Sequence, residues 1–370
     1  MSSDVGDMDD GTQWGVGRLL ARAAAADLCA DERLAVAIDD FFLPAESRLD
    51  ERSRSALGGT LTGLVSAVEG AVGQHAARLL AAREAPALAE ALANSEPLVL
   101  GRLVSSGLLR DAELMRELVG RARQEVLAGA LPVTAPEDPD RASLLARLIQ
   151  NSDGVVAGAA MALLAAESRR QGDADAMATR TDLPAELHHR LTWWTAAALR
   201  EHFIDIAGDS LSVLDRALID AAMRSVSSHD EGDRLEAVAM RLAAALDPRA
   251  DELAPLLVES LADRRLSLFV ALIGHALGLD YADAREIVLD PSGDRLWLVL
   301  RALELDRESI ARIGLALSEA DPRRDLDSFA EALDGIAATP STNARAALAP
   351  LLLHPDYRGA LLALARGARA

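Results

Sequence analysis

The chain has 370 residues, half of them hydrophobic, and a formal net charge of −20, which disfavours binding to the phosphate backbone of nucleic acids or to anionic membranes. All 38 basic residues are arginine, so the sequence excludes chemistry that needs a lysine, such as a P-loop phosphate site, a Schiff base or a protein-kinase lysine. Cys29 is the only cysteine, which excludes an intramolecular disulfide and a metal site built from cysteines.

The first residues of the chain, 1–14, are acidic and rich in glycine, and we expect them to be disordered. They lack the basic start and apolar stretch of a signal peptide. No uninterrupted apolar run approaches the ~20 residues that a membrane-spanning helix needs. We therefore expect a cytoplasmic protein without a membrane partner. An amphipathic helix is expected from about Val16 to Phe42, ending near Pro44.

A second long helix is expected to begin near Leu49 and to run through TLTGLVSAVEGAVGQHAARLLAA, residues 60–82. It contains several glycines, each roughly 1 kcal/mol less favourable in a helix than alanine. Such a run indicates close approach of a neighbouring helix, and a dimer interface is one way to provide it. The glycines are Gly58, Gly59, Gly63, Gly70 and Gly73.

The clearest linker is PVTAPEDPDR, residues 132–141. Three prolines and three acidic residues in ten positions cannot continue a helix. We therefore predict an N-terminal helical domain over residues 15–131 and a C-terminal helical-repeat domain over residues 142–370.

The last third of the chain contains an internal repeat. ALGLDYADAREI, residues 276–287, and ALELDRESIARI, residues 302–313, match in register. Each segment is typical of a helix, a tight turn whose Asp can cap the next helix, and then that helix. We therefore expect an all-α fold of HEAT-like helical-hairpin repeats, arranged as an α-solenoid or as a multi-layer helical bundle.

The segment LHHRLTWWTAAALREH, residues 187–202, is unusual because it holds two of the four tryptophans and three of the seven histidines. At about 100° per residue, one stripe of this helix is apolar and is predicted to face the core. That stripe consists of Leu187, Leu191, Trp194 and Ala198. A second stripe is aromatic and cationic and consists of His189, Trp193 and Arg200.

The second stripe has two interpretations. Trp193 can pack against an adjoining helix, with His189 and Arg200 at its edge. Alternatively, the three residues form a partner-binding or dimerisation surface, because Trp and Arg dominate interface hot spots. We expect no metal site here, since His188 and His189 diverge on a helix and chelation from one face needs an i,i+4 spacing.

A phosphoryl-accepting histidine is a further alternative. His189 followed by Arg190 has the local pattern of histidine phosphotransfer and histidine-kinase dimerisation domains. The chain lacks a recognisable glycine-rich ATP-binding box, so we do not expect autonomous kinase activity. It also lacks a GxSxG elbow and any other constellation for hydrolysis or redox chemistry. His75 and His275 lie in apolar helical contexts and are expected at the edge of the core.

Three segments together resemble an uncharacterised helical family of alphaproteobacterial proteins, domain of unknown function 2336. They are residues 41–73, residues 85–114 and residues 183–202, of which the third is the most specific because its paired tryptophans are followed by AALR. The resemblance implies a helical-repeat fold and a bacterial cytoplasmic setting, and brings no established activity. The glycines of the second long helix depart from the family's pattern.

The sequence therefore predicts a non-catalytic interaction or regulatory protein, acting in bacterial signalling and needing no cofactor. Its partner is expected to be another protein or a second copy of the chain, bound through His189, Trp193 and Arg200. Two alternatives stay open: a phosphorelay protein that uses His189, and a small-molecule sensor with a pocket between repeats.

Overall fold

Every element of the described residues is a helix, and none of these residues forms a strand. The computed structural model describes residues 49–83, 85–132, 142–171, 181–354, 357–358, 360–361 and 364. The all-α prediction is confirmed. The expected disordered start, the helix expected before Pro44, Cys29 and nearly all of the segment 132–141 lie outside the described residues. The chain divides into Met1–Asp50 and Glu51–Ala370, and all the described helices belong to the second unit.

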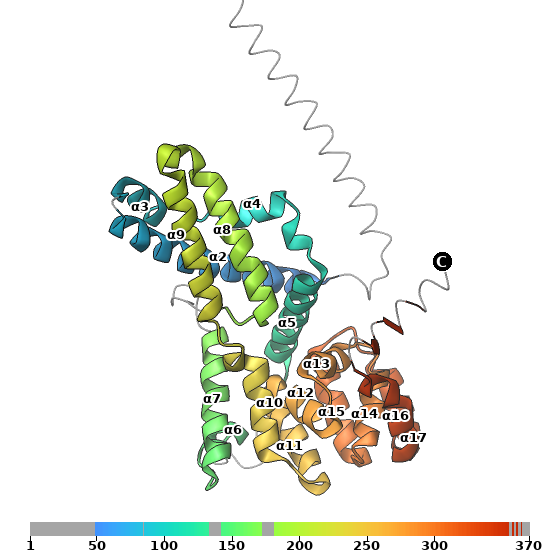
Figure 1. Ribbon diagram of the computed structural model, residues 1–370. Helices are drawn as coiled ribbons and strands as arrows, with labels where there is room; N and C mark the ends of the chain where they lie inside the picture. Colours follow the sequence, from blue (N-terminus) through green and yellow to red (C-terminus); the bar gives the residue numbers. More distant parts are fainter. Residues whose placement is uncertain are drawn as a thin grey trace, which may run out of the picture. The chain divides into compact units, whose positions relative to one another are not determined.

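A first hydrophobic cluster joins two stretches that are far apart in the sequence. Its buried side chains come from Leu64 to Leu118 and again from Leu183 to Ala222. Figure 1 shows the long helix α2 beside α8 and α9, which contact it directly. The elements of this cluster are α2 (Glu51–Ala82), α3 (Pro86–Ala93), α4 (Val99–Ser105), η2 (Leu108–Arg110), α5 (Ala112–Ala130), α8 (Ala185–Ala207), η3 (Gly208–Ser210) and α9 (Leu211–Ser227).

A second hydrophobic cluster contains the remaining helices. It begins with Leu127 near the end of α5 and continues through buried side chains as far as Leu348. The elements are α6 (Leu144–Ile149), α7 (Gly154–Gln171), η4 (Glu231–Asp233), α10 (Leu235–Leu246), α11 (Ala250–Ala262), α12 (Leu266–Leu277), α13 (Tyr281–Leu289), α14 (Asp294–Ala302), α15 (Arg307–Ala320), α16 (Leu326–Ala338), α17 (Ser341–Leu348) and η5 (Ala349–Leu352).

Helix α5 contributes to both hydrophobic clusters. Leu114 and Leu118 in its first half belong to the first cluster, and Leu127 belongs to the second. The division predicted at residues 132–141 stays a prediction. The two hydrophobic clusters do not divide at the predicted linker, because α8 and α9 come after it in the sequence and pack in the same cluster as α2 to α5.

A cluster of buried ion pairs lies where α5, α7, α10 and α13 meet. Arg170 on α7 pairs with Glu236 on α10 at 2.7 Å, and Arg285 on α13 pairs with Glu117 on α5 at 2.8 Å. Four guanidiniums face three carboxylates in this group, which we call the ion-pair cluster. Its members are Glu117, Arg121, Arg170, Asp182, Arg234, Glu236 and Arg285.

The turns of the internal repeat have the predicted chemistry. Asp280 precedes α13 and its carboxylate accepts a hydrogen bond from the backbone N–H of Asp283 at 2.7 Å. Asp306 precedes α15 and accepts from the N–H of Ser309 at the same distance. Each side chain satisfies an N–H group that the first helical turn leaves unpaired. The Asp caps expected from the repeat are therefore present.

The glycines of α2 do not contact a neighbouring helix within the described residues. A Cβ built on Gly58, Gly59, Gly63, Gly70 or Gly73 would meet no atom within 4 Å. Close approach of a helix from the same unit was therefore a wrong expectation for the described part of the chain. The side of α2 that carries these glycines has room for larger side chains.

Helix α2 is the one described helix that is long and apolar enough to cross a membrane, or one of up to two if the bent pair α12 and α13 counts as a single span. Core helices of soluble proteins pass the same test. Here α2 contacts α3, α5, α8 and α9, and the Glu69 carboxylate on it accepts a hydrogen bond from the backbone N–H of Leu98 at 2.9 Å. The cytoplasmic location remains a prediction.

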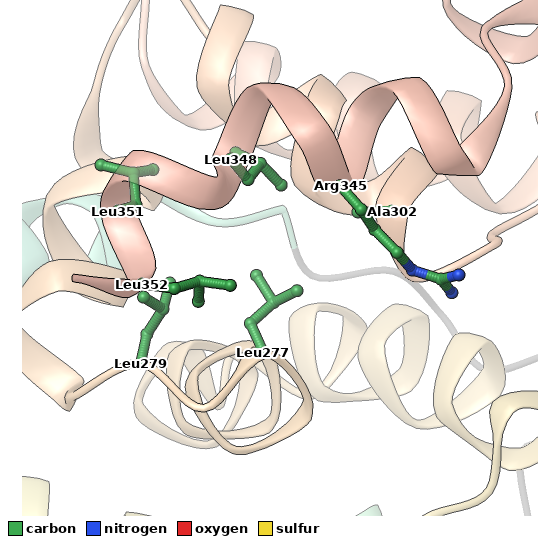
Figure 2. A pocket seen from close by; sticks show the side chains of 7 residues that line it. All are labelled: Leu277, Leu279, Ala302, Arg345, Leu348, Leu351 and Leu352. Atoms are coloured by element: carbon green, nitrogen blue, oxygen red, sulfur yellow. The ribbon is translucent and has the colours of Figure 1, made fainter.

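A small apolar cavity lies between α12, α14 and the end of α17. Figure 2 shows leucines approaching it from both sides, with Leu277 and Leu279 opposite Leu351 and Leu352. Its volume is about 40 Å³. The guanidinium of Arg345 extends away from these leucines and pairs with Glu304 at 2.9 Å. The cavity is too small to hold more than one or two water-sized groups.

Candidate functional site

Helix α8 carries the aromatic and histidine residues that the sequence singles out. It has 23 residues and begins after Pro184. Glu186 lies in its first turn, where the helix dipole stabilises a negative charge. Leu187, Leu191 and Ala198 are buried in the first cluster, and Trp194 is half-buried against it. The predicted core-facing stripe therefore faces the core.

His189 and Trp193 lie together on the opposite side of α8. His189 is exposed, and its ring lies edge-on to the indole of Trp193 with 6.2 Å between the ring centroids. Trp193 is half-buried and packs partly against the first cluster. The imidazole of His189 makes no hydrogen bond among the described residues. The structure thus brings two of the three predicted surface residues into contact.

Arg200, the third predicted residue, is directed toward α9. Its Nε lies 2.6 Å from an oxygen of Asp215, and the guanidinium is partly exposed. Arg190 is similarly engaged, because it pairs with Asp111 at 2.9 Å and also with Glu113. These ion pairs fix the sides of α8 to neighbouring elements. The part of the predicted surface that remains free consists of His189 and Trp193.

His188 lies in an environment that sequence periodicity did not anticipate. Its imidazole is buried and stacks on that of His229 with centroids 4.1 Å apart and the planes 13° apart. Its Nε2 lies 3.3 Å from the carbonyl oxygen and 3.3 Å from the hydroxyl of Ser225, and its Nδ1 lies 2.5 Å from the Thr181 hydroxyl. Since a hydroxyl can donate or accept, these partners suit either neutral tautomer of the ring.

The two stacked imidazoles differ in their surroundings. Burial lowers the pKa of His188 to about 4, and the neighbouring imidazole of His229 adds to this shift. His188 is therefore neutral at physiological pH. His229 places its Nε2 2.8 Å from the carbonyl oxygen of Leu183, which can only accept, so this nitrogen carries a hydrogen.

These histidines line a polar cavity of about 220 Å³, which we call the His188 pocket. Its walls come from α2, α8 and α9, from the residues that directly follow α9, and from Thr181, which precedes α8. Six of the side chains that line it carry a guanidinium, an imidazole or a hydroxyl group: His75, Arg78, Thr181, His188, Arg224 and His229. No pattern in the sequence predicts this set, because His75 and Arg78 on α2 lie more than a hundred residues before its other members. The adjacent histidines His188 and His189 were the one local signal.

The described residues contain no group of three or more His, Cys, Asp or Glu side chains that could hold a metal ion. His75, His188 and His229 line the same pocket without forming such a group. In the pocket, Nε2 of His188 and Nε2 of His229 each lie within hydrogen-bond distance of a backbone carbonyl oxygen. The pocket is therefore built for hydrogen bonding.

The fold and these two sites define a class of protein: an all-helical protein with an aromatic surface on one side of α8 and a polar pocket on the other. The chain belongs to an uncharacterised protein family conserved in bacteria, DUF2336, which matches residues 133–349. A search of curated proteins and a search of solved structures found no match.

The family match covers one of the three segments that resemble the family. It includes residues 183–202, with the paired tryptophans, and the internal repeat over 276–313. The segments at 41–73 and 85–114 precede the matched residues. Membership of the family is therefore shown by the second part of the chain, which contains α6 to α17.

Proposed function

We propose that the protein is a non-catalytic helical interaction protein that acts in bacterial signalling and binds another protein through the outer side of α8. We further propose that its helical hairpins stack as HEAT-like repeats, supported by the matching Asp-capped turns before α13 and α15. The cytoplasm is the proposed location.

The observation that carries this proposal is the position of Trp193. Large aromatic side chains contribute heavily to protein interfaces, and 3% of this chain is aromatic. Trp193 nevertheless lies on the outer side of α8, only half-buried, with His189 against its edge. Ile204, about three turns farther along α8, is 38% exposed, and Val104 on the contacting helix α4 is 58% exposed. An apolar anchor of a partner chain can bury these groups together.

The test uses a photo-crosslinking residue in place of Ala197, which is exposed on the outer side of α8. We expect a specific adduct in the living bacterium that disappears when Trp193→Ala is added. The matched control places the same crosslinker at Leu315 on α15, which is also exposed. An adduct of twice the chain's mass identifies self-association and one of another mass identifies a different partner.

Two further measurements make the test decisive. Trp193→Ala with Arg200→Ala should abolish the association while circular dichroism shows unchanged helicity. No adduct above the Leu315 control, or an adduct that survives the double substitution, would reject the α8 surface as the binding site.

A phosphorelay role for His189 is a second candidate, favoured by an imidazole that is exposed and makes no hydrogen bond among the described residues. We expect transfer of a phosphoryl label from phosphorylated response regulators to the protein, and its loss in His189→Ala. Label that persists in this variant rejects the role, and Trp193→Ala separates it from partner docking.

A further inference from the structure

The His188 pocket is lined by positive charge and hydrogen-bonding groups. Arg78 on α2 and Arg224 on α9 contribute two guanidiniums from different helices. Imidazoles and hydroxyl groups supply further polar atoms, and the lining includes no Asp or Glu. The two guanidiniums can only donate, so they favour a ligand with acceptor oxygens or negative charge.

The two guanidiniums are not neutralised by carboxylates of the described residues. Arg78 lies 3.2 Å from Nδ1 of His75, and neither Arg78 nor Arg224 forms an ion pair with an acidic side chain. The nearby carboxylate of Asp220 is engaged by Arg83 at 2.8 Å. On the neighbouring helix α8, by contrast, Arg200 pairs with Asp215 of α9 at 2.6 Å. In a chain of net charge −20, two guanidiniums without a carboxylate partner among the described residues thus line one cavity.

Both guanidiniums act on the same part of the pocket. Burial lowers the pKa of His75, and the positive charges of Arg224 and Arg78 lower it further. The two cations therefore converge on His75 from α9 and α2. The buried imidazole of His188 is neutral at physiological pH, so it adds no charge to the pocket. The amide of Gln74 also lines the pocket and can donate to oxygen atoms of a ligand, while the Ser228 hydroxyl donates to the Ser225 carbonyl oxygen at 3.2 Å.

We propose that the His188 pocket binds a small soluble oxyanion, the phosphate or carboxylate group of a metabolite, between Arg78 and Arg224. Guanidiniums bind both groups through parallel hydrogen bonds, which gives orientation as well as attraction. The volume of about 220 Å³ lies below the roughly 300–1,000 Å³ of pockets for drug-sized ligands, so the ligand is the anionic group with few additional atoms. This site is separate from the proposed partner surface and gives the sensor alternative a specific place.

The test is isothermal titration calorimetry of the full chain with inorganic phosphate and, separately, with succinate. We expect saturable binding of at least one of the two, and the one that binds identifies the oxyanion. Arg78→Gln and Arg224→Gln should each weaken binding about tenfold, and the double variant about a hundredfold, as expected for loss of charged hydrogen bonds. Both side chains are exposed, so these substitutions should leave the fold intact.

Arg216→Gln is the matched control, because Arg216 is exposed on α9 outside the pocket lining. It should bind like the wild type. Nitrogen-15 spectra of the imidazoles should show the His229 and His75 signals shifting with ligand while His275 does not. Absence of saturable binding of either anion to the wild type, equal binding by the double variant, or equal loss in Arg216→Gln would overturn the proposal.

Discussion

At the scale of single residues, Gly314 shows how closely the second cluster is packed. A Cβ at this position of α15 would overlap the ring of Phe329 on α16. That ring is 8% exposed and lies 4.5 Å from the indole centroid of Trp297. The absence of a side chain at Gly314 therefore allows α15 and α16 to approach each other around an aromatic pair.

We predict that Gly314→Ala lowers the free energy of unfolding by about 1–3 kcal/mol, because Phe329 must leave its packed position. Gly335→Ala on α16 is the control, since a Cβ there would meet nothing within 4 Å and alanine is the better helix former. Urea denaturation checks both variants. Equal stability of the two would show that Phe329 can move without cost.

His188 predicts a specific dependence of stability on pH. Its pKa in the folded protein is about 4, below the ordinary 6.5, so the unfolded chain binds the proton more readily. The resulting stabilisation is complete above pH 6.5 and is lost as the pH falls toward 4. Screening by the open pocket reduces the effect, and we expect a loss of about 1–2 kcal/mol between pH 7 and pH 5.

The measurement is urea denaturation at pH 7 and pH 5 for the wild type and for His188→Gln. The variant should lose less stability over this interval than the wild type. A pH dependence that is identical in the two proteins would mean that other histidines determine it.

At the scale of elements, side-chain caps decide where the helices of the internal repeat begin. Asp280 and Asp306 each bond to the backbone N–H three positions later, and Asp325 before α16 does the same at 3.0 Å. We predict that Asp306→Ala costs about 1 kcal/mol, whereas Asp306→Asn retains most of the stability because its amide oxygen can still accept. Equilibrium unfolding distinguishes the two. Equal losses would show that the cap contributes through charge and not through the hydrogen bond.

The sequence was most informative about the individual helices and their caps. The spacing of apolar residues predicted helices throughout, and the Asp of each repeat turn predicted a cap, because both signals are local. The same reasoning was wrong to expect a close helix of the same unit at the glycines of α2, because a run of glycines does not show where a neighbouring helix lies. It also missed Arg78, Arg224 and His229, since contacts between distant segments leave no periodic trace in one sequence.

At the scale of the whole unit from Glu51 onward, the ion-pair cluster joins helices of both hydrophobic clusters. Burial alone would raise the pKa of Glu236, but the charges of Arg170, Arg121 and Arg234 outweigh burial and lower it to about 2. Glu236 is therefore charged in the folded protein. Its stabilising contribution is present above its ordinary pKa of 4.5 and is lost as the pH falls toward 2.

We predict that Glu236→Gln lowers the stability of the unit by about 3–5 kcal/mol, because the substitution leaves buried guanidiniums without their carboxylate. High salt should change this loss little, since buried pairs are weakly screened. Arg307→Ala is the control because its pair with Asp334 is largely exposed, and it should have no measurable effect. A tolerated Glu236→Gln would show that water replaces the missing carboxylate.

Helix α5 has a consequence for how the unit opens. Leu114 and Leu118 are held by one hydrophobic cluster and Leu127 by the other, so neither cluster can separate completely while this helix stays intact. In native-state hydrogen exchange, the backbone amides between these leucines should therefore be among the slowest of the described residues. Their exchange reports global opening, whereas the outer helices α16 and α17 should exchange through local opening first.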